Sequence, residues 1–246
     1  VFESLEELDV TTVIHDGTLV VADREYIGQQ FDFDYSGFLG QVNTGKKYQS
    51  DDFRITPAEG SASLDVKVIE VIKDSLATGL NIMPFDVSHG ELRSDPGKDV
   101  IKIAVIERHK GTGSFSLGFV KGLGIKKGAI ASTVAHDSHN LIVAGCDDAS
   151  MARAVNLLSK KGGGMVVVTD KIDYFPLEIA GLMSTSKIEK VVNDYKKIKE
   201  AAMKLGSPLE NAFMTMSFLA LPVIPKLKIT NRGLVDVDKF QLVNLY

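Results

Sequence analysis

A run of five polar residues interrupts an apolar stretch in the middle of the chain, in the order His136, Asp137, Ser138, His139 and Asn140. The residues on either side, 129–134 and 141–144, are apolar and resemble buried strands. A connection between two such strands has its backbone held by the scaffold while its side chains stay free for chemistry. A histidine beside a carboxylate can exchange protons near neutral pH, as general acid–base catalysis requires. The two histidines and the aspartate are therefore candidate catalytic residues, and the serine and asparagine are candidate substrate-binding residues.

The same run could instead take part in a metal site. His136 and His139 are three residues apart, which is close enough to share one site on a turn. Two imidazoles need at least a third ligand. His89, His109 and Asp137 are available, but nothing in the sequence brings them together. We favour a hydrogen-bonding cluster that orients a substrate or a neighbouring domain. A metal site made only from this chain and a purely structural role are the alternatives.

Glycines precede this run, but they fit no phosphate-binding motif. Gly113 and Gly118 have the spacing of a P-loop, yet Phe119 stands where that motif requires lysine. Gly122 and Gly124 lack the third glycine of the dinucleotide fingerprint. We interpret these glycines as turn and close-packing residues.

Nucleophilic catalysis has little support in the sequence. Ser138 lies in no G-x-S-x-G elbow. Cys146 precedes a predicted helix, whose N-terminus could lower the pKa of the thiol, but no partner base is evident. A small buried packing residue is the favoured interpretation. As the single cysteine it cannot form an internal disulfide, which indicates a reducing compartment and a cytoplasmic location.

The elements that must position the run form a mixed pattern of strands and helices. Residues 100–106 (VIKIAVI) are nearly all apolar, as expected of a central strand covered on both faces. Asp147 should cap a helix over 148–160 that stops at Gly162, and Ser186 with Glu189 predicts a capping box for a helix reaching about residue 205. Further predicted segments are strands at 64–72, 82–85, 115–121, 128–134, 141–145, 165–169 and 174–179, a buried helix or extended segment at 213–224, and a strand with a turn at 227–238. These elements predict an α+β fold of the α/β sandwich type.

Charge is distributed unevenly along the 246 residues. Residues 1–50 contain nine acidic and three basic residues, whereas the remainder carries a net charge of +2. The overall charge of −4 argues against nucleic acid or an anionic membrane as a partner, and no apolar run has the roughly 20 residues of a membrane span. We predict strands of a β-rich unit at 1–27, with a hairpin turn at Asp16–Gly17, a linker or loop at 28–50, and a second domain at 51–246. The start at valine suggests a segment of a longer chain.

Long runs of this sequence, in order, closely resemble the C-terminal region of bacterial adenine deaminases, which belong to the amidohydrolase superfamily. The resemblance spans roughly residues 51–246. It is carried by residues 52–54, 118–145 (GFVKGLGIKKGAIASTVAHDSHNLIVAG), 162–164, 176–177, 179–183, 213–215, 217–225 and 232–236. Residues 1–27 resemble returning strands of the small β-sandwich that flanks the catalytic barrel in that superfamily.

The resemblance implies hydrolytic deamination of adenine to hypoxanthine and ammonia by a metal-bound hydroxide. It also implies manganese or iron held in a TIM-like barrel by a His-x-His pair and acidic residues, and a homo-oligomer. This sequence contains no His-x-His and leaves no room for a barrel of about 250 residues, so no metal ligand is assigned here. We predict the C-terminal part of an adenine deaminase, inactive alone, whose residues 136–140 cover or complete the site of the missing barrel. The alternative is a stand-alone, non-catalytic domain that binds a purine or a partner protein.

Overall fold

The computed structural model describes residues 1, 4, 6–29, 31, 33–58 and 60–246, which divide into two compact units, Val1–Gly37 and Phe38–Tyr246. The smaller unit is a three-stranded antiparallel sheet in the order β1-β2-β3. Its first two strands flank Asp16 and Gly17, whose backbones both have positive φ, so the predicted hairpin is confirmed. The strands are β1 (Val13–His15), β2 (Thr18–Ala22) and β3 (Glu25–Tyr26).

The larger unit is built on an eight-stranded sheet in the order β11-β10-β8-β9-β6-β7-β4-β5. Its neighbours pair antiparallel except β4 and β7, which run parallel. The predicted central strand is confirmed, since all seven residues of β6 are buried. The strands are β4 (Ser63–Val71), β5 (Thr78–Asp86), β6 (Val100–Ile106), β7 (Phe115–Lys121), β8 (Ala129–Ser132), β9 (Leu141–Gly145), β10 (Gly164–Val168) and β11 (Ile172–Pro176).

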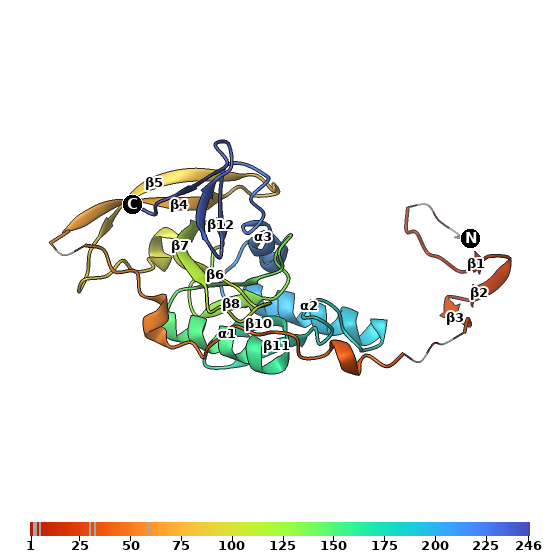
Figure 1. The fold of residues 1–246 in the computed structure, drawn as a ribbon. Coiled ribbons are helices and arrows are strands. Elements are labelled where there is room, and N and C mark those ends of the chain that lie inside the picture. The colour runs from red at the N-terminus through yellow and green to blue at the C-terminus, as the bar shows by residue number, and fades with distance from the viewer. Residues whose placement is uncertain (2–3, 5, 30, 32, 59) are drawn as a thin grey trace. The chain divides into compact units, whose positions relative to one another are not determined.

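Helices and a small second sheet cover the two faces of this sheet, which gives the predicted α+β sandwich; the described residues form no closed barrel. Figure 1 shows α1 on one side of the sheet, and α3 with β12 on the other. The helices are α1 (Asp148–Lys161), α2 (Ile188–Lys204) and α3 (Ala212–Phe218), with single 3₁₀ turns at Ser36–Phe38, Ser50–Phe53 and Pro96–Lys98. The second sheet contains β12 (Leu227–Thr230), β13 (Gly233–Asp236) and β14 (Gln241–Val243).

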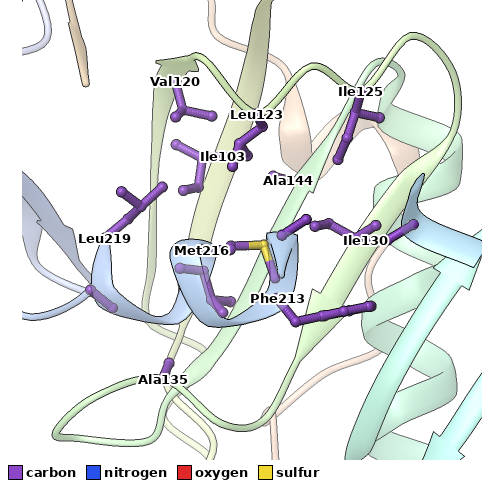
Figure 2. Close-up of a cluster of buried hydrophobic side chains, with 14 of the residues drawn as sticks. Ile103, Val120, Leu123, Ile125, Ile130, Ala135, Ala144, Phe213, Met216 and Leu219 are labelled. Atoms are coloured by element: carbon purple, nitrogen blue, oxygen red, sulfur yellow. The ribbon is translucent and has the colours of Figure 1, made fainter. Parts of the chain in front are cut away.

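Alternation along the strands gives each face its own core, because successive side chains of a strand point to opposite faces. On one face, Ala104 and Val143 pack under α1. On the other, the segment after α2 covers the sheet: Figure 2 shows Phe213, Met216 and Leu219 beside Ile103, Ile130 and Ala144. The segment predicted to be a buried helix or extended run is thus a short helix followed by a turn.

The helix ends show where local sequence signals held and where they did not. Asp147 accepts a hydrogen bond from the Ser150 amide at 2.7 Å, and Gly162 ends α1 in the left-handed conformation, so both predicted caps are confirmed. The capping box predicted at Ser186 and Glu189 is wrong, because the N-cap of α2 is Lys187, which makes no side-chain capping bond. The Ser186 amide bonds to the Ser184 hydroxyl instead, at 3.2 Å. No helix in the described part of the chain is both long and apolar enough to cross a membrane.

The chain from Phe38 to Ser50 also belongs to the larger unit. Tyr48 is buried against α1, where its amide and carbonyl both bond to the side chain of Asn156, at 2.9 and 2.8 Å. Its ring packs edge-on against Phe115 of β7. Residues 38–50 therefore run along the α1 face of the sheet.

Candidate functional site

The predicted polar run connects β8 to β9 as a tight turn. Asp137 and Ser138 are exposed, the two histidines are half-buried, and Asn140 is buried. His139 closes the turn on itself: its amide donates to the carbonyl of Ala135 at 2.6 Å, and the Ala135 amide lies 3.3 Å from its ring Nδ1. The ring of His139 is thus turned back onto the backbone.

Arg108, which follows β6, anchors this turn from inside the protein. Its side chain is buried, and its Nε donates to the carbonyl of His139. The remaining nitrogens donate to the carbonyls of Ala180, at 3.0 Å, and Thr133, at 3.4 Å. Burial lowers the pKa of the Arg108 guanidinium to about 10. The position of the polar turn is therefore fixed by a buried cation that satisfies backbone carbonyls.

Glu107 organises the loop beside it. Its carboxylate accepts hydrogen bonds from the amides of His109, Lys110 and Thr112 at 2.5, 2.8 and 3.0 Å. Burial alone would raise the pKa of Glu107, but these backbone hydrogen bonds outweigh it and lower the value to about 2. The loop brings His109 to the polar turn, with its Nε2 2.8 Å from the carbonyl oxygen of Ser138.

The two histidines of the turn lie side by side. Their ring centroids are 5.4 Å apart, and the ring of His136 also packs on Phe218 at the end of α3, at 4.6 Å. Burial lowers the pKa of His139, and the nearby His136 and Arg108 lower it further. An imidazole with a lowered pKa is neutral at neutral pH, so His139 is available there as a hydrogen-bonding group rather than as a cation.

These groups do not fit a metal ion. Among the residues that the structure describes, no three of His, Cys, Asp and Glu lie close enough to bind one. His109 is brought to the turn, but its Nε2 faces a carbonyl oxygen. His89 lines a different cavity, with Arg54 and Arg93. The metal centre implied by the family resemblance therefore finds no donor set in this part of the chain.

A cleft of about 900 Å³ opens beside the polar turn. Asp137 and Ser138 lie on it, whereas His136, His139 and Asn140 are not among its lining residues. The remaining walls come from the segment after α3 and from the β12–β14 sheet: Ala220, Leu221, Pro222, Val223, Thr230, Asn231, Arg232, Val235, Phe240, Gln241 and Leu242. The cleft combines a few polar groups with mostly apolar walls, as small-molecule sites commonly do.

Asn140 connects the polar turn to the far side of the cleft. Its Nδ2 lies 3.2 Å from Oδ1 of Asn231, in the turn between β12 and β13, and Nδ2 of Asn231 lies 3.0 Å from the Ser114 hydroxyl. The sequence predicts only a strand with a turn at 227–238, and nothing in its spacing indicates that Asn231 meets a residue 91 positions earlier. Thr230 and Arg232 were missed for the same reason.

Cys146 lies at the start of the connection to α1 and is half-buried. Burial raises the pKa of its thiol to about 12, and the nearby Asp147 also raises it. Its Sγ lies 3.4 Å from the carbonyl of Ile125. A thiol held protonated in this way is a poor nucleophile, which supports a packing role.

Comparison with known proteins gives one consistent family. Residues 75–241 match the model of the adenine deaminase C-terminal domain. A protein named adenine deaminase from Desulfatibacillum aliphaticivorans is 48% identical over 197 residues, covering 79% of this chain and 34% of its own length. Those from Clostridium botulinum and Methanothermobacter thermautotrophicus are 40% and 41% identical, over 99% and 100% of this chain.

The chain spans 41% of the Clostridium protein and 45% of the Methanothermobacter protein, so it corresponds to less than half of each. The matched region contains the polar turn, the helices α1, α2 and α3, and most of the residues that line the cleft. The runs that carry the resemblance lie in the same unit. This chain belongs to the adenine deaminase C-terminal domain family.

Proposed function

We propose that this chain is the C-terminal portion of an adenine deaminase and acts together with a catalytic barrel contributed by the rest of that enzyme. The relatives that bear this name are more than twice as long as the part matched here. Manganese or iron held by that barrel would supply the activated water. For this chain we propose a role in binding and orienting the base, in the cleft beside the polar turn.

The observation that carries this role is the cleft beside the polar turn. Asp137 and Ser138 present an exposed carboxylate and hydroxyl on it, and Arg108 fixes the backbone behind them. His136 and His139 stabilise the turn. Their rings contact each other, and the ring of His139 accepts a hydrogen bond from the Ala135 amide. In the complete enzyme, we place this surface over the mouth of the barrel.

Exposed apolar residues on the smaller unit favour this reading over a stand-alone binding domain. Ile14, Leu19 and Tyr26 are 63%, 45% and 58% exposed, although they lie in strands. Apolar strand residues that face water are typical of a surface that another part of a protein covers. A free-standing domain would be expected to bury or replace them.

Ammonia release from adenine, measured with added Mn²⁺, tests the proposal. This chain alone should release none, whereas a chain extended upstream to include the barrel should turn over adenine. In the extended enzyme, the double variant His136→Ala/His139→Ala should lower kcat/KM at least about tenfold, since the turn that presents Asp137 and Ser138 loses its support. His89→Ala, a histidine in another cavity, is the matched control and should leave the kinetics unchanged.

Two results would contradict the proposal. Ammonia release by this chain without any companion polypeptide would place the reactive water within these 246 residues. Unchanged kinetics of the double-histidine variant would remove the polar turn from the active site, even if the extended enzyme is active.

A further inference from the structure

The turn between β12 and β13 forms a second polar wall of the cleft. Thr230, Asn231 and Arg232 all line it, together with Asp137 and Ser138 of the polar turn. The wall is well supported: the Arg232 amide donates to the Thr230 hydroxyl at 3.2 Å, and the Ser116 hydroxyl of β7 donates to the Thr230 carbonyl. A hairpin tip held in this way presents its side chains in a fixed geometry.

The side-chain carboxamide of Asn231 makes two of the four hydrogen bonds that such a group can make. Its Oδ1 accepts one hydrogen bond, from Asn140, and its Nδ2 donates one, to Ser114. A carboxamide has two N–H donors and two acceptor positions on oxygen, so one donor and one acceptor have no partner among the residues that the structure describes. A paired donor and acceptor on one planar group is complementary to the edge of adenine that carries the N7 acceptor and the N6 amino donor.

Asn140 lies outside the cleft and donates a hydrogen bond to Asn231. It is 5% exposed, it does not line the cleft, and its Oδ1 has no hydrogen-bond partner within the described part of the chain. Burying an unpaired carbonyl oxygen costs stability. The side-chain hydrogen bond that Asn140 does make runs from its Nδ2 to Oδ1 of Asn231. That nitrogen orients Asn231, which makes Asn140 a positioning residue.

Arg232 and the apolar walls suit the faces of a planar ring. The guanidinium of Arg232 is exposed and makes no ion pair with any carboxylate among the residues described. Guanidinium groups stack on aromatic faces. Leu221, Val235 and Leu242 add apolar surface to the same cleft.

We propose that Asn231 and Arg232 bind a purine base in this cleft, Asn231 by the N6/N7 edge and Arg232 by the ring face, with Asn140 holding Asn231 in place. The identity of the base as adenine rests on the proposed function. Neither residue belongs to the polar turn; both lie between β12 and β13 and line the same cleft as Asp137 and Ser138.

Calorimetric titration of this chain with adenine and with unsubstituted purine, which lacks the N6 amino group, tests the inference. The unchanged chain should bind adenine more tightly than purine. Asn231→Ala should weaken adenine binding about tenfold and bring the two affinities close together, because the lost hydrogen bond is the one that recognises N6. Arg232→Ala should weaken both ligands by a similar factor. The surface variants Asn193→Ala and Arg153→Ala are matched controls and should bind both ligands as the unchanged chain does.

Absence of saturable adenine binding would overturn the inference, as would an unchanged adenine-to-purine ratio in Asn231→Ala, since a purely structural asparagine would not alter that ratio. If Asn231→Ala does not fold, Asn231→Leu replaces it: leucine keeps the size, removes both the acceptor for N6 and the donor to N7, and should abolish the preference for adenine. If the extended enzyme releases no ammonia but Asn231→Ala still loses the preference, only the proposed function fails. If ammonia is released and Asn231→Ala binds normally, only this inference fails.

Discussion

At the scale of single residues, Arg108 joins segments that are far apart in the sequence. It is 2% exposed and donates to carbonyls of His139, Ala180 and Thr133. Arg108→Ala would leave these buried oxygens without donors and create a cavity, so we expect the free energy of unfolding to fall by about 3 kcal/mol or more. Urea denaturation at neutral pH measures this. Arg153→Ala, an exposed arginine on α1, should change stability by less than about 0.5 kcal/mol, and equal losses in the two variants would contradict the anchoring role.

Glu107 should make the stability of the loop depend on acid pH. Its pKa in the folded protein is about 2, below the ordinary value of 4.5, because backbone amides bond to its ionised form. A depressed pKa stabilises the folded state above pH 4.5, and this contribution is lost as the pH falls from about 4.5 to about 2. Glu107→Gln cannot ionise, so we expect a flatter dependence of the urea midpoint on pH in that window. An identical pH profile in the variant and the unchanged chain would argue against this role.

The residues of the site divide into those that sequence could identify and those that it could not. Asp137 and Ser138 are recognisable because they lie in one polar run between apolar strands, and both lie on the cleft. Asn231 and Arg232 lie in an ordinary hairpin turn, and only the folded sheet brings them there. The sequence predicts that Asn140 binds substrate, whereas the structure places it behind the cleft, where its Nδ2 bonds to Asn231.

At the scale of elements, a buried ion pair connects the central strand to α1. Nζ of Lys102 in β6 lies 2.8 Å from Oδ1 of Asp148, at the first position of α1, and 2.9 Å from the carbonyl of Phe53. Lys102→Met would leave the half-buried carboxylate without its cation, and removing one partner of such a pair costs about 3 kcal/mol. The double variant Lys102→Met/Asp148→Asn should recover part of that loss. A double-mutant cycle from urea titrations measures the coupling, and additive losses would show that the pair contributes nothing specific.

The short helix α3 offers a matched pair of methionines. Met216 is fully buried against the sheet, as Figure 2 shows, whereas Met214 is 40% exposed two residues earlier. Met216→Ala should lower the free energy of unfolding by about 2–4 kcal/mol through lost burial and the remaining cavity. Met214→Ala should cost less than about 1 kcal/mol. The comparison uses thermal or urea unfolding, and similar costs at the two positions would mean that α3 does not pack as described.

Element prediction succeeded where the signal is local. The apolar run of β6 and the caps of α1 are determined by neighbouring residues, and both appear as expected. The parallel pairing of β4 with β7 and the order of the eight strands depend on contacts between distant segments, which no local pattern shows. The capping box at Ser186 failed because the serine amide bonds to Ser184 and the helix begins later.

At the scale of the whole molecule, the two units differ in how much they bury. Every residue of β6 in the larger unit is buried, whereas none of the described residues of Val1–Gly37 is. A small antiparallel sheet without a buried face is marginally stable in water. If the proposed catalytic barrel covers these apolar strands, we expect the smaller unit to acquire its stability from that contact.

Hydrogen exchange followed by mass spectrometry makes this measurable. In this chain alone, backbone amides of residues 13–26 should exchange within about a minute at neutral pH, while those of β6 should stay protected for hours, because opening free energies follow burial. In the chain extended to include the barrel, exchange in residues 13–26 should slow at least about tenfold, while β6 changes little.

The replacement Ile14→Ser, at a residue that is 63% exposed here, should leave exchange in the isolated chain unaffected and speed exchange of residues 13–26 in the extended enzyme. Slow exchange of residues 13–26 without the barrel would mean that the smaller unit is stable by itself and needs no covering domain.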